Sequence, residues 1–419
     1  MRARRVVPAG WLLALSAIGV SAAPPDRPVI RVNQRDGTRV LTPRFITPAV
    51  AIDDDGGFAA VWADEDPQGA PLGVYARRFD GQGRPECGDI TLEVAPRSGD
   101  SVTVAGAANG RFVVAWDAVN REDGVGRDAW YRVFDRRGNA ASVVLRANAL
   151  AHGQQGQSTV GMARDGRFVV AWRGDTSTSF SDEAVSVRIF GPEGEPETGD
   201  IRVTRASDRS PAYPRLAVGD DGALAVVFVT GFQGGGESVY LRRYDRSGNP
   251  EGEASRVNLS LSGPQREASV AVRRDRSVVV AWDGLNVGDP SARTWDSAVC
   301  VRLFSADGEP LSGEIRADAG DAMYAFSPTV ASAGDGSFAV AWSSHADPFS
   351  SRVLLRRFRA DGSPAGPARD VCEDSPGHHS LPSLAGNRRG DLVVVWSTIV
   401  RDGDSTHHLV NSRSFPAGS

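Results

Sequence analysis

The eight-residue phrase DGRFVVAW occupies residues 165–172, and a near copy, NGRFVVAW, occupies residues 109–116. Weaker copies follow as DRSVVVAW at 275–282 and DGSFAVAW at 335–342. Each copy joins a polar turn to a short run rich in Val and Ala that ends in Trp. Turn residues followed by short β-branched runs are typical of β-hairpins. The recurrence of one such phrase at long intervals predicts a repeat architecture built from strands.

The repeat extends over most of the chain. Its closing aromatic recurs at steps of 54, 56, 56, 54, 60 and 54 residues, and the seven positions are Trp62, Trp116, Trp172, Phe228, Trp282, Trp342 and Trp396. An Arg-x-aromatic motif follows each of them, at Arg77/Phe79, Arg132/Phe134, Arg188/Phe190, Arg242/Tyr244, Arg302/Phe304, Arg356/Phe358 and Arg413/Phe415. Seven equivalent arginines are interpreted as fasteners between repeats, stacked on Trp or bonded to backbone carbonyls.

Each copy contains four short segments with strand character, and the last of them resembles DIRVT at 200–204. Four strands per unit, repeated at this period, predict an all-β fold, a seven-bladed β-propeller of four-stranded blades. The seventh copy ends after its third strand, and the phrase VIRVN at 29–33 matches the missing fourth strand. We therefore expect residues 29–33 to complete the last blade and to cover an otherwise exposed sheet edge.

The first 22 residues have the pattern of a signal peptide. MRARR is basic, an apolar run follows, and small residues precede Ala23. This pattern predicts cleavage after Ala22, a secreted or periplasmic protein, and a single propeller domain over 23–419. No later apolar run is long enough to span a bilayer, so no membrane span is expected in the mature chain.

Composition narrows the range of partners. The net charge is −5, and no basic stripe dominates the sequence, which argues against nucleic-acid binding. Three cysteines, Cys87, Cys300 and Cys372, are too few for a disulfide framework, and buried or free thiols are expected. The chain is expected to be a monomer.

The repeat resembles a tandem repeat of large bacterial exported proteins, some of which are similar to haemolysin-type surface proteins. The resemblance rests on the pattern DGxFVVAW, followed by RxFDxxGxPxG and a closing VN, in all seven copies. It implies a propeller and export, and it carries no activity with it. Loops after the Trp could hold Ca²⁺ in that family, but here they have diverged from copy to copy.

Function is expected where the copies differ, in the loops after each Trp and in the connections between copies. Variable loops on a rigid scaffold commonly carry binding sites, and both kinds of loop should emerge at one mouth of the axial channel. The leading hypothesis is a non-catalytic propeller that binds a glycan or protein partner at the cell envelope through this face. Candidate binding residues are Trp295, Trp130, His345, His378, His379, His407, His408 and Asp374.

These candidates have ordinary alternatives. The two tryptophans would stack on sugar rings, or else pack in the core. The histidines would bind a ligand or a metal, or else decorate exposed loops. Weak metal candidates are His345, Asp347, His379 and Asp404, but no ligand-spacing motif is present, and so no cofactor is assigned beyond Ca²⁺ in Asp-rich loops.

The alternative hypothesis is an enzyme, either a sialidase-like glycoside hydrolase or a polysaccharide lyase. Asp, Gly and Trp recur in DDGGFAAVW at 54–62, but at a spacing that differs from the sialidase Asp-box. Catalysis would require acids or histidines that converge at the mouth of the axial channel, as a paired-carboxylate mechanism does. The repeated arginines do not single out a substrate-binding set.

Overall fold

The computed structural model describes sixteen segments of the chain, and all structural statements below concern them. They are residues 26–34, 39–40, 48–65, 71–94, 101–119, 126–150, 153–176, 182–208, 210–231, 236–260, 263–285, 297–318, 324–347, 350–373, 375–402 and 405–418. The signal-peptide prediction for residues 1–22 lies outside them.

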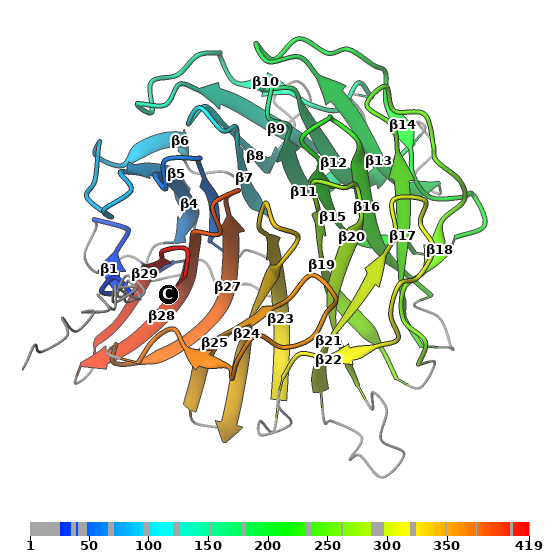
Figure 1. Cartoon of the computed structure of the whole chain (residues 1–419). Helices are drawn as coiled ribbons and strands as arrows, with labels where there is room; N and C mark the ends of the chain where they lie inside the picture. Colours follow the sequence, from blue (N-terminus) through cyan, green and yellow to red (C-terminus); the bar gives the residue numbers. More distant parts are fainter. Residues whose placement is uncertain are drawn as a thin grey trace, which may run out of the picture.

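All regular secondary structure in these segments consists of β-strands, mostly in four-stranded antiparallel sheets (Figure 1). The first sheet contains β2 (Arg39–Val40), β3 (Ala49–Ile52), β4 (Phe58–Glu65), β5 (Pro71–Phe79) and β6 (Ile90–Val94). The second contains β7 (Val102–Gly106), β8 (Phe112–Val119), β9 (Arg127–Phe134) and β10 (Leu145–Arg146). The third contains β11 (Gln155–Met162), β12 (Phe168–Asp175), β13 (Glu183–Phe190) and β14 (Ile201–Arg202).

The later copies form the remaining sheets. The fourth sheet contains β15 (Ala212–Val218), β16 (Leu224–Thr230), β17 (Ser238–Tyr244) and β18 (Ser255–Arg256). A larger sheet joins β19 (Gln265–Val272), β20 (Val278–Leu285), β21 (Ser297–Phe304) and β22 (Ile315–Arg316) to β23 (Tyr324–Ser332), β24 (Phe338–Asp347), β25 (Ser350–Phe358) and β26 (Arg369–Asp370). Its two halves meet through one parallel pairing, Ser297 with Tyr324. The last sheet contains β27 (His378–Gly386), β28 (Leu392–Asp402), β29 (Ser405–Phe415) and β1 (Ile30–Arg31). The all-β prediction is confirmed.

The quoted phrase forms the second strand of its copy, and this strand is buried along its length. Trp116 and Trp282 have no exposed surface, and neighbouring Val and Ala residues are equally buried. Each hydrophobic cluster contains side chains from two adjacent copies, because both faces of a sheet are covered by its neighbours. The phrase is therefore part of the scaffold, since it supplies the packing between sheets.

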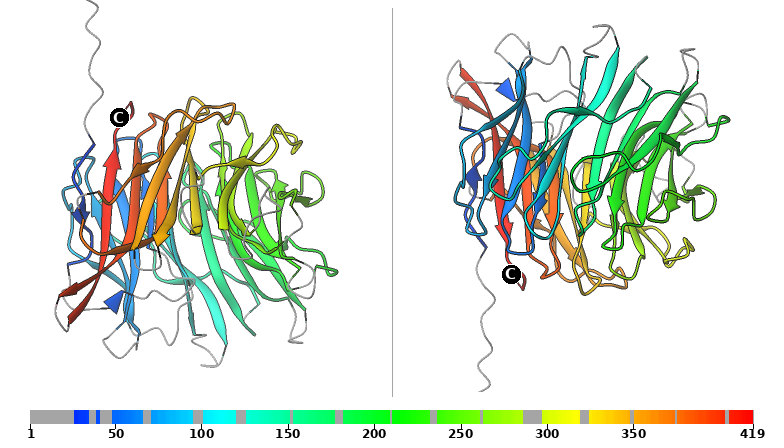
Figure 2. Two further views of the ribbon diagram at one scale, coloured as in Figure 1. Left: turned by 90° about the horizontal axis from the view of Figure 1, so that it is seen from below. Right: turned by 90° about the horizontal axis from the view of Figure 1, so that it is seen from above.

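The first strand of each copy lies innermost. These strands, β3, β7, β11, β15, β19, β23 and β27, contact one another in chain order, and β27 also contacts β3. Both views of Figure 2 place the blue N-terminal sheet against the red and orange C-terminal strands. The innermost strands thus surround a common axis, and their two ends define the two mouths of an axial channel.

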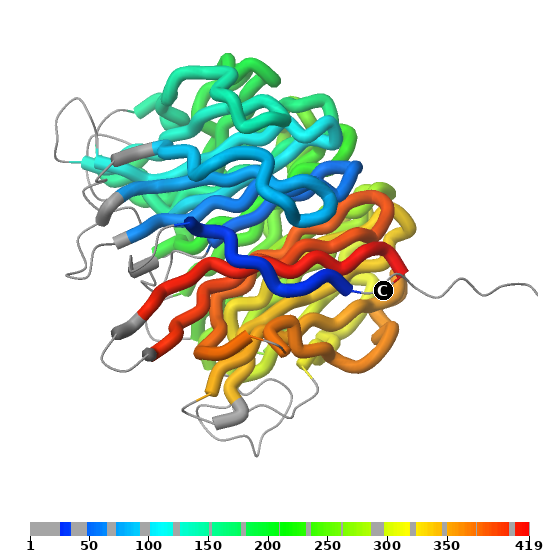
Figure 3. The backbone as a smooth tube through the Cα atoms, turned by 90° about the vertical axis from the view of Figure 1, so that its left-hand side faces the viewer, coloured from blue at the N-terminus to red at the C-terminus, as the bar shows by residue number. Residues whose placement is uncertain are grey.

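The N-terminal strand completes the last sheet, as the sequence predicts. β1 pairs antiparallel with β29, with Ile30 opposite Ser412, and Figure 3 shows the dark-blue strand beside the red one. The Asn33 side chain accepts a hydrogen bond from the Val410 backbone N–H at 3.1 Å. Asn148 and Asn258 make the same bond in their own copies. The Asn that ends the repeat therefore has the same structural role in all three places.

The repeated arginines connect adjacent sheets. The Arg77 guanidinium donates to the Val32 carbonyl at 2.9 Å, and Arg302 donates to the Val257 carbonyl at 2.7 Å. Arg188, Arg242, Arg356 and Arg413 bond equivalent carbonyls of the preceding copy. Each repeated guanidinium also lies over the aromatic ring of its own motif, at 5.4 to 5.8 Å from the centroid. The fastener interpretation is borne out, although the stacking partner is Phe or Tyr rather than the repeated Trp.

All three cysteines are free thiols, and Cys300 and Cys372 are buried. Among the residues described, none belongs to a helix of the length and apolar character that a bilayer crossing requires.

Candidate functional site

The channel mouth on the side of the post-Trp loops holds a cavity of about 230 Å³ lined by all seven innermost strands. Five of these strands carry a β-bulge near the mouth, shown by register shifts against the second strand. A bulge redirects a side chain and is common beside active sites. The innermost strands are therefore irregular at this mouth, where their pairing departs from that of an ordinary sheet.

In each of the five bulges, one residue at the same repeat position has a left-handed backbone conformation. The φ angle is 56° at Gln157, 53° at Tyr213, 44° at Glu267, 51° at Ser327 and 56° at Leu381. Each residue lies fifteen positions before the closing aromatic of its copy. A non-glycine residue in this region costs about 1–3 kcal/mol, and such strain concentrates at functional sites. We call these five residues the bulge ring.

Chemically active side chains of the ring gather on β15 and β19. Tyr213, Arg215 and Glu267 all line the cavity. Burial raises the pKa of the Tyr213 phenol, so the hydroxyl keeps its proton at neutral pH. Burial lowers the pKa of Arg215, and the charge of Glu267 opposes that change. A phenol, a guanidinium and a carboxyl group therefore line one cavity.

A second carboxyl group lies next to Glu267. Asp283 follows Trp282 at the end of β20 and pairs in register with Arg266. Burial, followed by the charge of Glu267, raises the pKa of Asp283 well above its ordinary value. Arg266 forms an ion pair with Glu237, which directly precedes β17. We call Tyr213, Arg215, Glu267 and Asp283 the mouth cluster.

Ser327 holds the Glu267 carboxylate in place. Its hydroxyl donates a hydrogen bond of 2.6 Å to Glu267 Oε2. Ser327 belongs to the bulge ring and to β23, so the bond joins neighbouring innermost strands. This hydrogen bond therefore fixes the orientation of the carboxylate before any ligand binds. A charged group that is held in place in this way can stabilise a developing charge without first reorienting.

Asp117 is a fully buried acid behind the ring. It follows Trp116, and its carboxylate accepts bonds from the Ser101 hydroxyl at 2.8 Å and the Gln157 backbone N–H at 2.7 Å. Burial raises its pKa from 3.8 to about 6, against the opposing effect of hydrogen bonds from Ser158, Ser101 and Gln157. The acid thus joins the second sheet to the third and titrates near neutral pH.

Asp117 should make folding stability depend on pH. Its folded-state pKa is raised, so the folded protein holds this proton over a range in which the unfolded chain has released it. The contribution to the free energy of unfolding is greatest below about pH 4 and falls by roughly 3 kcal/mol as the pH rises through about 6. Urea unfolding across this range should show a smaller decline for Asp117→Asn than for the parent. Parallel pH profiles would contradict the prediction, because Asp283 contributes equally to both proteins.

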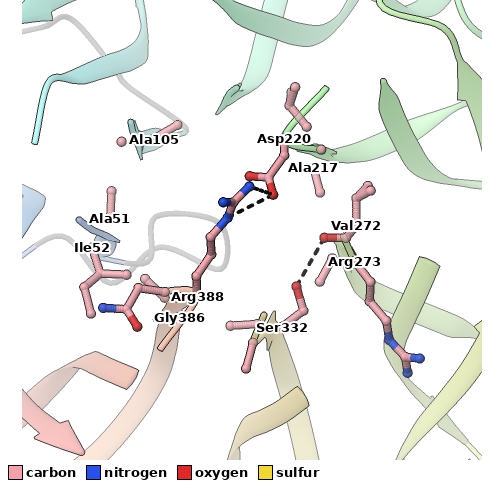
Figure 4. Close-up of a pocket in the computed structure, with 18 of the residues that line it drawn as sticks. Ala51, Ile52, Ala105, Ala217, Asp220, Val272, Arg273, Ser332, Gly386 and Arg388 are labelled. Atoms are coloured by element: carbon pink, nitrogen blue, oxygen red, sulfur yellow. Dashed lines mark hydrogen bonds and ion pairs between the residues drawn. The ribbon is translucent and has the colours of Figure 1, made fainter. Parts of the chain in front are cut away.

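The opposite mouth is larger and differently built. Its cavity of about 310 Å³ is lined mostly by small apolar residues of the innermost strands. Arg388 reaches across it to Asp220, with Nε 3.1 Å from Oδ2 (Figure 4), and Arg164 pairs with Asp54 at 2.7 Å. Both ion pairs join sheets that are not adjacent, so they cross this end of the channel. Chemistry is therefore expected at the other mouth.

The histidines predicted to form a site lie at strand ends away from the mouth cluster. His378 is exposed on β27, His407 is half-buried and His408 is buried on β29, and the Ile399 backbone separates His378 from His408. His345 packs against the ring of Phe326, with centroids 5.2 Å apart.

His379 is buried inside the last sheet. The Trp396 indole N–H donates to its Nδ1 at 3.3 Å, and its Nε2 lies 3.0 Å from the Ser375 carbonyl. An indole can only donate and a carbonyl can only accept, so the ring is the neutral tautomer with its proton on Nε2. Burial lowers the pKa of His379 in the same direction. Both ring nitrogens are thus engaged within the sheet.

The remaining candidates are Trp130 and four residues that fall wholly or in part outside the described segments. Trp130 is buried on β9 opposite Trp116, within a hydrophobic cluster. Trp295, Asp374 and Asp404, like the Asp347 side chain, lie outside the described residues. Among the residues described, no group of three His, Cys, Asp or Glu side chains is arranged to hold a metal ion.

The mouth cluster was missed by sequence reasoning. Tyr213, Arg215 and Glu267 lie on the first strands of their copies, and Asp283 follows a closing Trp. At the ring position the side chain changes from Gln157 to Tyr213 to Glu267. Alignment of the copies on their Trp, followed by a search for the most variable position on the first strand, would have found the ring. A single-copy motif search has no means of finding it.

No protein-family model and no curated protein matches the sequence. Among solved structures, polysaccharide lyase Uly1 is similar with a TM-score of 0.53 and 11% identity, covering 88% of this chain and 89% of that one. Polysaccharide lyase PL25, an ulvan lyase bound to -[GlcA(1-4)Rha3S]-, has a TM-score of 0.54 and 11% identity, covering 93% and 96%. An α-L-arabinanase of Penicillium chrysogenum complexed with arabinobiose has a TM-score of 0.46 and 11% identity, covering 77% and 95%.

These similarities support a β-propeller fold and correct the leading functional prediction. The sequence predicted a non-catalytic binding module, whereas the similar structures are enzymes that act on polysaccharides. The prediction was wrong because it treated the lack of a repeated catalytic motif as a sign against catalysis. A catalytic site that uses different side chains in different copies would leave no such motif.

Proposed function

We propose that this protein is a polysaccharide lyase that cleaves a uronate-containing glycan by β-elimination at the mouth cluster. One observation carries the proposal. Arg215, Tyr213 and Glu267 line one cavity, so a cation for the uronate carboxylate lies beside two groups able to transfer protons. The fold similarity to two polysaccharide lyases supports the reaction class, and the sugar sequence of the substrate is not inferred from them.

The roles follow from the charge of each group. Arg215 binds the uronate carboxylate and stabilises the negative charge that develops on it. Glu267 removes the proton from C5 of the uronate, and the electron pair forms a double bond between C4 and C5. The bond between C4 and the glycosidic oxygen breaks, and Tyr213, which burial keeps protonated, donates its proton to that oxygen. The products are an unsaturated uronate end and a free hydroxyl on the leaving sugar.

The proposal is tested with residues 23–419 and a panel of polysaccharides, some containing uronic acids and some neutral. The new double bond is conjugated to the carboxylate, so β-elimination raises ultraviolet absorbance together with reducing ends. We expect both signals on at least one uronate polymer and on no neutral one. Binding without cleavage across a panel that includes glucuronate, galacturonate, mannuronate and guluronate polymers would overturn the proposal.

A second candidate is glycoside hydrolysis, because the mouth cluster contains two interacting carboxyl groups. Asp283 holds its proton through burial and the charge of Glu267, which is the condition for the general acid of a glycosidase. Hydrolysis produces reducing ends without the ultraviolet signal. The same panel therefore separates the two reactions.

The finer features of the fold are part of the proposal. We infer seven four-stranded blades, with β1 as the fourth strand of the last one, because seven innermost strands each begin a sequence copy. We also infer that the protein is exported after cleavage behind Ala22 and that its repeat belongs with those of bacterial exported proteins. A polysaccharide substrate outside the cytoplasm fits both inferences.

A further inference from the structure

The left-handed residue of a bulge has a backbone N–H that leaves the sheet ladder and needs another acceptor. In β11, Gln157 N–H donates to Asp117 Oδ2 at 2.7 Å. In β27, Leu381 N–H donates to Ser343 Oγ at 3.0 Å. Asp117 and Ser343 occupy the same repeat position, directly after the closing Trp of the preceding copy. In these two copies the residue after the preceding Trp is thus the acceptor for the bulge N–H.

Tyr213 has no such acceptor. The equivalent residue of the preceding copy is Arg173, whose guanidinium can only donate. The Tyr213 N–H instead donates to Oε1 of Gln157 at 2.8 Å. Gln157 is itself a member of the bulge ring, and its own N–H is held by Asp117. A chain of contacts therefore runs from Asp117 through Gln157 to Tyr213 and crosses three sheets.

We infer that Gln157 is a positioning residue for Tyr213, which keeps the left-handed backbone that directs the phenol into the mouth. The catalytic role of the Tyr213 phenol in this inference rests on the proposed function. The placement of the phenol by Gln157 rests on the geometry alone. Without the acceptor, the N–H of a half-buried strained residue loses its partner. The backbone would then relax toward an ordinary strand conformation and turn the phenol away from Glu267.

The test compares two substitutions of similar shape. Gln157→Met removes the acceptor and keeps the length of the side chain, whereas Gln157→Glu keeps an acceptor oxygen. We expect Gln157→Met to lower kcat by roughly 10- to 100-fold, because small misplacement of a catalytic group has effects of this size. KM should stay within about twofold, since Arg215 still binds the carboxylate, and Gln157→Glu should retain most activity. The exposed Gln154→Met is the matched control.

Failure of the inference and failure of the proposed function give different results. If Tyr213→Phe abolishes activity while Gln157→Met does not, the inference is overturned and the proposed role of Tyr213 stands. If Tyr213→Phe is fully active, Tyr213 has no catalytic role. An ultraviolet titration of the Tyr213 phenol then tests whether Gln157 positions it. The Tyr213 signal, taken as the difference from Tyr213→Phe, should show a pKa that falls toward the ordinary 10.0 in Gln157→Met. An unchanged pKa would overturn the inference.

Discussion

Glu267→Gln should lower kcat on the uronate polymer by about a thousandfold, the loss expected when a general base is removed. The reason is that an amide cannot accept the C5 proton at neutral pH. The amide oxygen still accepts the hydrogen bond that Ser327 donates to Oε2 at 2.6 Å, so the mouth should keep its shape. KM should change little, because Arg215 rather than Glu267 holds the substrate carboxylate. Initial rates followed by ultraviolet absorbance measure both constants.

Glu253→Gln is the matched control for this substitution. Glu253 is exposed between β17 and β18 and pairs with Arg205, away from the cavity. Its loss should leave kcat unchanged and move the melting temperature little, since an exposed ion pair contributes little to stability. A Glu267→Gln variant that keeps half of the parental rate would assign proton removal to another group.

The scaffold was predictable because its residues have the same structural role in every copy. A Trp that fills the space between two sheets, an Arg that bonds a carbonyl of the preceding copy and an Asn that ends the fourth strand are repeated for the same physical reason. The phrase at residues 29–33 was identified as a missing fourth strand because it matches the fourth-strand phrases of other copies, such as DIRVT at 200–204. Local sequence pattern and tertiary contact agree at each of these positions.

The site was not predictable in this way, because it depends on one backbone conformation that sequence pattern does not report. Tyr213 and Glu267 face the channel only because a bulge places each in the left-handed region. Val, Ile and Leu patterns reveal the alternation of a strand and hide the one-residue insertion that breaks it. The histidines drew attention through composition, yet the fold distributes them along strand ends and buries His379.

Val32→Asp should destabilise the whole protein by about 3–5 kcal/mol, the range for a buried and unpaired charge. Val32 has no exposed surface and packs with side chains of the first and last sheets. Its N–H donates to the Val410 carbonyl at 2.7 Å, and its carbonyl accepts from Arg77 at 2.9 Å. One residue thus joins the N-terminal strand, the last strand and the first sheet. Thermal and urea unfolding measure the loss.

The neighbouring Arg31→Asp introduces the same side chain at an exposed position of the same strand, so it controls for the effect of Asp on strand propensity. It should cost less than about 1 kcal/mol, as surface substitutions do. If β1 only decorated the edge of a sheet that is stable without it, both variants would unfold near the parental midpoint. A large loss for Val32→Asp alone would instead mean that the contact between first and last copies is integral to one cooperative unit. The strained bulges at the mouth would then depend on that contact as well, and Val32→Asp should lose activity at temperatures where Arg31→Asp retains it.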